Sequence, residues 1–234
     1  MELENILFLD IETVGGTATY DELDERMKHF WDIKASQIAH SEDDTPEKLY
    51  SRAAIYAEFG KIVCISVGYI VQNKVRLTSF ADDDEKKLLL AFADLLNKHF
   101  NTPKHQLCAH NGKEFDFPYI CRRMLIHNIP IPFILNSQGK KPWETTFLDT
   151  MELWKFGDYK HYTSLDLLAN IFHIPSPKDD INGSQVHETY WKENHNLERI
   201  KTYCEKDVLT IVQLMRRFNH LPLIEDENIL HIQQ

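Results

Sequence analysis

Residues 5–13 read NILFLDIET, and the strand that they predict decides the fold. The apolar run from Asn5 to Asp10 is typical of a buried strand that delivers polar side chains at its carboxyl end. Asp10 and Glu12 lie two positions apart, so on a strand their side chains point to the same face. The stretch therefore predicts a first strand that presents two carboxylates together.

The patterns that follow predict a mixed sheet flanked by helices. Two alternating stretches, 61–71 and 74–80, predict antiparallel strands joined by a tight turn at Gln72-Asn73. Short apolar stretches predict a fourth strand at 105–110 and a fifth at 145–154. Helical periodicity marks four further stretches, at 84–99, 116–127, 164–172 and 196–219. The order implies an α/β fold with a five-stranded sheet, three strands antiparallel and the others parallel.

Length and composition favour one domain. The chain has 234 residues, of which 43% are hydrophobic and 26% charged, as in ordinary globular proteins. We expect a single domain over 1–220 and a short C-terminal tail over 221–234. Within the domain, 15–60 reads as a helical insertion, with helices around 20–36 and 46–58. Residues 128–145 read as a surface loop and 173–195 as mostly irregular.

Targeting signals and cysteine usage point to an unexported protein. The N-terminus has no basic segment leading into an apolar one, and no apolar run reaches the roughly 18 residues that span a bilayer. The four cysteines show no C-x-x-C spacing and lie in apolar or helical stretches, so we expect neither zinc nor disulfides. They are Cys64, Cys108, Cys121 and Cys204. We expect a soluble, cytoplasmic protein without a membrane partner.

Two later motifs carry further carboxylates. Asp116 ends HNGKEFD at a predicted strand-turn-helix, at the sheet edge where α/β proteins usually place their sites. Tyr203 and Asp207 in YCEKD lie four apart on a helix, with Cβ atoms roughly 5–6 Å apart. Four converging carboxylates would repel one another unless divalent cations lay between them. Oxygen ligands without His or Cys favour Mg²⁺ or Mn²⁺ over zinc.

These motifs resemble, in order, the three exonuclease motifs of the DEDD superfamily of 3′–5′ exonucleases: D-I-E, N-x-x-x-F-D and Y-x-x-x-D. Tyr203, where other members have His, resembles the DEDDy branch, which includes the proofreading domains of family B DNA polymerases. The stretches AEFGKIVCISVGY and AHNGKEFDFPYICRRM also resemble stand-alone bacterial proteins described as predicted polymerase-B-like 3′–5′ exonucleases. The resemblance covers about residues 5–215.

The resemblance implies a ribonuclease H-like fold and a two-metal hydrolysis that releases nucleoside 5′-monophosphates from a 3′ end, in proofreading or repair. Asp10, Glu12 and Asp207 would hold the metal that generates the nucleophile. Asp10 would also bridge to a second metal, bound by Asp116. Tyr203 would orient the attacking water, since an ordinary tyrosine pKa near 10 makes it a poor base.

Contacts with the substrate are also implied. Thr13 and Asn111 resemble family positions near the terminal nucleotide, although a strand-end hydroxyl and a turn residue explain them equally well. Phe115 is a candidate to stack on a base, because aromatic faces accept any base. The net charge of −10 argues against a protein that coats nucleic acid through a broad basic surface. We expect a local grip on a single-stranded 3′ end, DNA in preference to RNA, with a polymerase or repair partner left open.

Other polar clusters have ordinary explanations beside the functional ones. Asp149 and Glu152 read as a strand edge leading into a helix cap. The irregular spacing of three histidines favours exposed loop residues over a zinc site; they are His161, His173 and His187. A late basic cluster is a candidate phosphate grip, although a solvated face explains most charge runs. Its members are Lys140, Lys141, Lys155, Lys160 and His161.

Two other functional classes stay open at this point. DIET after an apolar strand is similar to the D-x-D-x-T motif of phosphatases with an aspartyl nucleophile, but Glu12 replaces the second Asp and the Tyr203-Asp207 pair has no role there. A non-catalytic nucleic-acid-binding or protein-binding module on the same fold is the other. Loss of one carboxylate would mark such a module, and this chain keeps all four.

Overall fold

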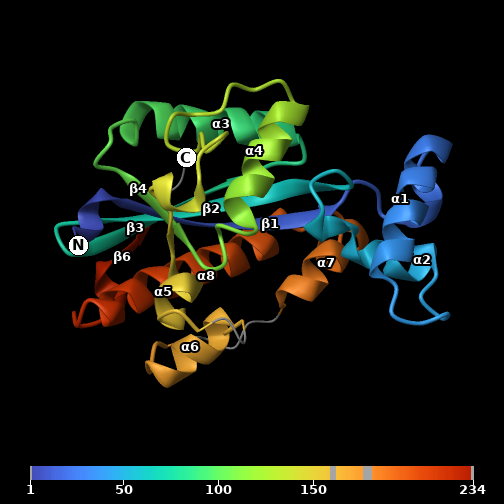
Figure 1. The fold of residues 1–234 in the computed structure, drawn as a ribbon. Helices are drawn as coiled ribbons and strands as arrows, with labels where there is room; N and C mark the ends of the chain where they lie inside the picture. Colours follow the sequence, from blue (N-terminus) through green and yellow to red (C-terminus); the bar gives the residue numbers. More distant parts are fainter. Residues whose placement is uncertain (1, 159–161, 176–180, 233–234) are drawn as a thin grey trace.

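The computed structural model describes residues 2–158, 162–175 and 181–232. A six-stranded mixed sheet in the order β5-β4-β1-β2-β3-β6 lies at its centre (Figure 1). β2 runs antiparallel to β1 and β3, whereas β4 is parallel to β1 and to β5, and β6 is parallel to β3. The strands are β1 (Ile6–Gly15), β2 (Gly60–Val71), β3 (Lys74–Ala81), β4 (Gln106–Ala109), β5 (Leu148–Asp149) and β6 (Ile229–His231). The predicted ribonuclease H-like α/β fold is confirmed, with one strand more than expected.

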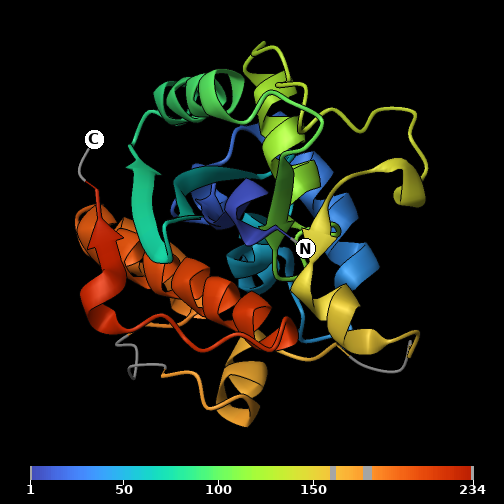
Figure 2. The same ribbon diagram turned by 90° about the vertical axis from the view of Figure 1, so that its left-hand side faces the viewer.

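Helices cover both faces of the sheet (Figures 1 and 2). α3 and α4 lie on one face and the long α8 on the other, while α1 and α2 lie beyond the ends of β1 and β2. The helices are α1 (Glu25–Ile38), α2 (Pro46–Leu49), α3 (Glu85–His99), α4 (Asp116–Ile126), α5 (Thr150–Lys155), α6 (Leu165–Ile171), α7 (Val186–Lys192) and α8 (Leu197–Phe218). Among the residues described, no helix combines the length and apolar composition needed to cross a membrane.

β1 separates the two cores by strand alternation. Leu7, Leu9 and Ile11 pack into the core under α3 and α4, whereas Ile6 and Phe8 pack toward α8. Because side chains on a strand alternate, Asp10 and Glu12 continue the α8 side. β1 runs to Gly15, with a bulge between Glu12 and Thr13, so the two carboxylates lie inside the strand rather than at its end as predicted.

The long periodic elements lie where the sequence predicts them. α3 begins after Asp84, whose carboxylate accepts from the amides of Lys86 and Lys87, and α8 begins after Asn196, which caps it in the same way. Gln72 and Asn73 both have positive φ, as the tight turn between β2 and β3 requires. Asn tolerates that conformation better than most residues because its side chain is short and polar.

Four expectations are wrong in detail. The fifth strand predicted over 145–154 is only Leu148–Asp149, because the Asp149 carboxylate caps α5 by accepting from Met151 N and Glu152 N. The stretch 173–195 contains α7, and the C-terminal tail contributes β6, which pairs with Val75–Leu77 of β3. The second helix expected over 46–58 is α2 followed by a 3₁₀ helix, Tyr50–Ile55.

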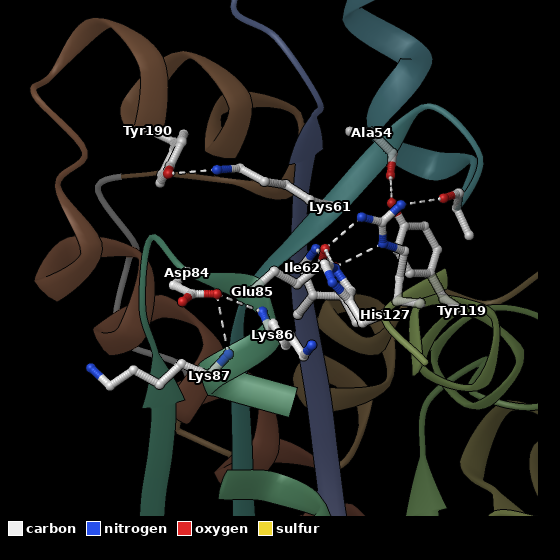
Figure 3. Close-up of polar contacts among 12 residues, drawn as sticks. Ala54, Lys61, Ile62, Asp84, Glu85, Lys86, Lys87, Tyr119, His127 and Tyr190 are labelled. Carbon is white, nitrogen blue, oxygen red and sulfur yellow. Dashed lines mark hydrogen bonds and ion pairs between the residues drawn. The ribbon is translucent and has the colours of Figure 1, made fainter. Parts of the chain in front are cut away.

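A buried ion pair connects α3 and α4 to the segment before β2. Glu85, 5% exposed, accepts from the amide of Ile62 at 2.7 Å and contacts His127 Nε2 at 2.7 Å (Figure 3). Arg123 of α4 donates through Nε to Glu85 at 2.8 Å and through Nη1 to the carbonyl of Ala57 at 2.8 Å. These contacts hold the start of β2, which pairs with β1, against α3 and α4.

Candidate active site

The first two carboxylates face α8 from the middle of β1. Asp10 is partly exposed and Glu12 is 7% exposed. Burial raises the pKa of both well above the ordinary values, and the neighbouring acids raise it further: Asp116 and Asp207 for Asp10, and Asp10 and Asp207 for Glu12. Two acids on one strand thus interact with acids from two helices.

Asp116 reaches this group from the first residue of α4. β4 ends at Ala109, and its pairing with β1 extends only to Phe8. The amide of Ile11, between the two β1 acids, donates instead to Asp116 Oδ1 at 3.2 Å. Asp116 is 2% exposed, and burial raises its pKa to about 7, with Asp149 and Asp207 adding to the rise.

Asp207 and Tyr203 complete the group from α8. They are one helical turn apart, and the Tyr203 hydroxyl forms a hydrogen bond with Asp207. Burial raises the pKa of Tyr203 above its ordinary value, and the charges of Asp207, Glu12 and Asp10 act in the same direction. Tyr203 therefore stays protonated at neutral pH and offers a hydrogen-bond donor rather than a base. The structure brings all five predicted catalytic residues together, while their catalytic role remains a prediction.

The donor chemistry of this group fits a divalent cation. The charged groups with the largest influence on Asp10, Glu12 and Asp116 are other acids, which raise the pKa of each carboxyl further. No described residue donates a hydrogen bond to the carboxylate of Glu12, although the side chain is buried. A group of buried carboxylates that repel one another is the arrangement that a metal ion stabilises.

Cysteine also lies at the site, contrary to the expectation of oxygen ligands alone. Cys204 of α8 has its Sγ 3.4 Å from Asp10 Oδ2 and 3.4 Å from the Asp10 carbonyl oxygen. Asp10, Glu12 and Cys204 each offer a ligand atom, and these atoms lie within 4.8 Å of one another. Cys204 is fully buried, as its helical context predicts, but its neighbour is a carboxylate rather than an apolar core alone.

Asp149 is the second residue whose place the sequence did not indicate. Besides capping α5, it accepts from the amides of Asn111 at 2.9 Å and Lys113 at 3.1 Å. The side chain is 2% exposed. It thereby holds the loop between β4 and α4 that ends at Asp116. The helix-cap interpretation is confirmed, but four amide donors for one carboxylate indicate a larger part in shaping the site.

The candidate substrate contacts have mixed environments. Asn111 has a φ of 60°, which fits a turn residue, yet its buried Oδ1 has no hydrogen-bond partner. Thr13 is buried with its side chain beside the hydroxyl of Tyr119, after the β1 bulge. Phe115 is partly buried and its ring packs against that of Tyr119, with centroids 5.4 Å apart. Asn111 alone keeps an unsatisfied polar atom.

Two of the three histidines can be placed. His173 is exposed as expected, but His187 lies in α7 and is partly buried, so the exposed-loop interpretation is wrong for it. Its Nδ1 accepts from the amide of Gly15 at 3.0 Å, and Nε2 lies 3.1 Å from the Ala18 carbonyl. Burial lowers the pKa of His187, consistent with a neutral ring that fixes the end of β1.

The late basic cluster is described only in part. His161 and Lys160 lie outside the described residues. Lys140 and Lys141 are exposed, and Lys155 lies over the Tyr162 ring at 5.1 Å.

Comparisons with known proteins agree with this geometry. The family described as predicted 3′-5′ exonuclease related to the exonuclease domain of PolB matches residues 55–227. That segment includes Asp116, Tyr203 and Asp207, whereas Asp10 and Glu12 precede it. Among solved structures, the family B DNA polymerase from the hyperthermophilic archaeon Pyrobaculum calidifontis is similar, with a TM-score of 0.53 and 17% sequence identity. The match covers 91% of this chain and 24% of the polymerase chain, and at that identity it supports the fold. From the extent of the family match, the chain belongs to the family of predicted 3′–5′ exonucleases related to the exonuclease domain of PolB.

Proposed function

We propose that the protein is a metal-dependent 3′–5′ exonuclease that hydrolyses the terminal phosphodiester of a single strand, DNA in preference to RNA, and releases nucleoside 5′-monophosphates. The observation that carries the proposal is the convergence of four acids and Tyr203 from β1, α4 and α8. Metal-ion hydrolysis needs such a set of oxygen donors to hold the ions. Proofreading or repair, with a polymerase or repair partner, is the setting that the family relation favours.

Asp10, Glu12, Asp116 and Asp207 would hold Mg²⁺ or Mn²⁺. When bound, two such ions supply activation of water and neutralisation of charge on the leaving oxygen. The protonated hydroxyl of Tyr203, fixed by its bond to Asp207, orients the water beside the scissile phosphate. Buried carboxylates on rigid elements set these positions before the substrate binds.

The loop between β4 and α4 would receive the terminal nucleotide. The orphaned Oδ1 of Asn111 is an acceptor for a sugar hydroxyl or a base N–H, and its burial makes a missing partner costly. Phe115 offers one aromatic edge next to the site, since its other side packs on Tyr119. Asn111 and Phe115 together would contact one nucleotide, which agrees with the removal of single nucleotides from the 3′ end of a strand.

The test is cleavage of matched DNA and RNA oligonucleotides, single-stranded and duplex, with the 3′ end free or blocked. With a 5′ label and Mg²⁺ or Mn²⁺, we expect stepwise shortening of strands with a free 3′ end, abolished by EDTA. Asp10→Asn should abolish cleavage. Tyr203→Phe should lower kcat about 10- to 100-fold with little change in KM, because only the orientation of water is lost.

Tyr69→Phe is the matched control, since it removes a tyrosine hydroxyl on β2 away from the acids, and it should cleave as the wild type does. The proposal fails if folded protein with metal never shortens a free 3′ end. Retained single-strand binding without cleavage would instead indicate a binding module. A covalent phosphoenzyme formed from a small phosphate ester would indicate a phosphatase.

A further inference from the structure

The thiol of Cys204 lies beside the carboxylates of Asp10 and Glu12 on β1. Its Sγ is 3.4 Å from Asp10 Oδ2, and ligand atoms of Asp10, Glu12 and Cys204 all lie within 4.8 Å of one another. In a tetrahedral Zn²⁺ site, bond lengths near 2.0–2.3 Å place neighbouring donors about 3.5 Å apart. The distance between Cys204 Sγ and Asp10 Oδ2 matches this spacing, and the Glu12 oxygen lies within 4.8 Å of both atoms.

Glu12 provides an independent indication that this spot receives a cation. Its side chain is 7% exposed, and no described residue donates a hydrogen bond to its carboxylate. The groups acting on it most strongly are Asp10, Asp207 and Cys64, none of which offers a positive charge. A carboxylate at low exposure that is held beside other acids is repelled by them, and a bound cation removes that repulsion.

The ligand atoms decide which cation the site binds most tightly. Mg²⁺ binds oxygen ligands and gains nothing from a sulfur atom, whereas thiolates select soft or borderline ions such as Zn²⁺ and Cd²⁺. We propose that Asp10, Glu12 and Cys204 form a mixed carboxylate-thiolate site for a thiophilic divalent cation of the Zn²⁺ type. Binding transfers the thiol proton to solvent and forms a metal–sulfur bond. Such an ion occupies two of the acids assigned to Mg²⁺ or Mn²⁺, so it acts as a competitive inhibitor of the proposed exonuclease.

The site can be tested by direct binding, without any nuclease assay. Full-length metal-free protein is titrated with Cd²⁺ while the ultraviolet thiolate-to-cadmium charge-transfer band is followed. We expect one equivalent of Cd²⁺ to produce the band, excess Zn²⁺ to remove it, and Mg²⁺ at the same concentration to leave it. Cys204→Ser should lack the band and bind Cd²⁺ at least about tenfold more weakly, the lower end of what a change near a metal costs.

Cys121→Ser is the matched control, because Cys121 lies on α4 with its thiol directed at the Leu135 carbonyl. It should keep both the band and the affinity. Cys64→Ser tests the neighbouring thiol on β2, which lies 3.6 Å from Ser66 Oγ. Loss of the band in Cys64→Ser together with its survival in Cys204→Ser would overturn the assignment.

¹¹³Cd NMR of the wild type covers the case in which Cys204→Ser does not fold. A resonance downfield of the range for all-oxygen coordination supports a sulfur ligand, and a resonance within that range refutes it. If the protein binds Cd²⁺ through Cys204 but cleaves no nucleic acid, the metal site is supported and the proposed exonuclease activity is refuted. If it cleaves a free 3′ end but binds no Cd²⁺ through Cys204, the exonuclease activity is supported and the metal site is refuted.

Discussion

Asp116 is a buried acid whose ionisation can be followed through stability. Its pKa is about 7 in the folded protein against 3.8 in an unfolded chain, so between these values the native state binds more protons. The stability that Asp116 contributes to the metal-free protein is therefore fully present below about pH 4 and is lost as pH rises through 7. The shift corresponds to at most about 4 kcal/mol. Asp10 and Glu12, whose pKa values are also raised, act in the same direction.

Thermal melting in EDTA from pH 5 to pH 8 should show a falling Tm, on the order of 10 °C in total. Mg²⁺ or Mn²⁺ added at pH 8 should raise Tm, because metal binds the ionised acids of the native state only. Asp116→Asn should reduce the fall in Tm with pH and leave the part that Asp10 and Glu12 contribute. A Tm that rises with pH in EDTA would contradict the arrangement of the acids.

Asp149 accounts for the shape of the loop that ends at Asp116. Replacing it by Ala leaves the amides of Asn111 and Lys113 without their acceptor and removes the cap of α5. We expect a loss of about 1–2 kcal/mol from the cap alone, and a fall in kcat/KM because Asp116 and Asn111 lose their support. Urea unfolding and steady-state cleavage measure the two effects.

Glu152→Ala is the control for that variant, since Glu152 lies in the first turn of the same helix but is exposed and pairs with Lys113 at the surface. It should cost under about 0.5 kcal/mol, as exposed ion pairs usually do. Equal effects of the two variants would show that the hydrogen bonds of Asp149 to these amides contribute no more than an exposed ion pair does.

At the scale of elements, Glu85 ties α3 and α4 to the start of β2. Glu85→Ala would leave Arg123, whose side chain is 12% exposed, without its carboxylate partner. Breaking a buried pair in this way costs about 3–5 kcal/mol. Asp94→Ala on the same helix removes an exposed partner of Lys98 and should cost under about 0.5 kcal/mol. Urea midpoints that differ by less than about 1 kcal/mol between the variants would refute the role of the pair.

The elements that the sequence predicts well are those with a pattern of their own. α3 and α8 extend over 15 and 22 residues, and their apolar periodicity and N-caps locate both ends to within a residue or so. α7 has only seven residues, and its position depends on His187 and Trp191, which contact Gly15 far away in the chain. β6 has three residues and exists through its pairing with β3. Such elements are fixed by tertiary contacts, which a single sequence does not display.

The same distinction holds for the candidate site. Asp10, Glu12, Asp116 and Asp207 stand in motifs that can be read from the chain, and so does Tyr203. The part of Asp149 depends on which amides face it, and the part of Cys204 depends on how α8 crosses β1. Both residues occur in stretches with an ordinary explanation, a helix cap and a buried helix position. Their neighbours across the fold give them their chemistry.

At the scale of the whole molecule, a net charge of −10 limits how nucleic acid can bind. An acidic surface repels most of a strand, so the proposed function requires that contact with phosphates is confined to a few lysines near the 3′ end. Lys140, Lys141 and Lys155 are the described members of the late basic cluster, and Lys155 borders Tyr162, whose hydroxyl reaches Glu114 in the Asp116 loop at 2.7 Å. We therefore expect binding that depends only weakly on salt.

Fluorescence anisotropy with a strand carrying a 3′-terminal phosphorothioate, which resists cleavage in Mg²⁺, measures this dependence. Each phosphate contact on a single strand contributes about −0.7 to the slope of log K against log salt, so three lysines account for about −2. The wild type should show a slope no steeper than roughly −3, and the triple Ala variant at 140, 141 and 155 a slope shallower by about 2. Lys98→Ala, on α3 and paired with Asp94, should leave the slope unchanged. A slope near −6, or a triple variant that binds as the wild type does, would mean that the strand follows another path across the surface.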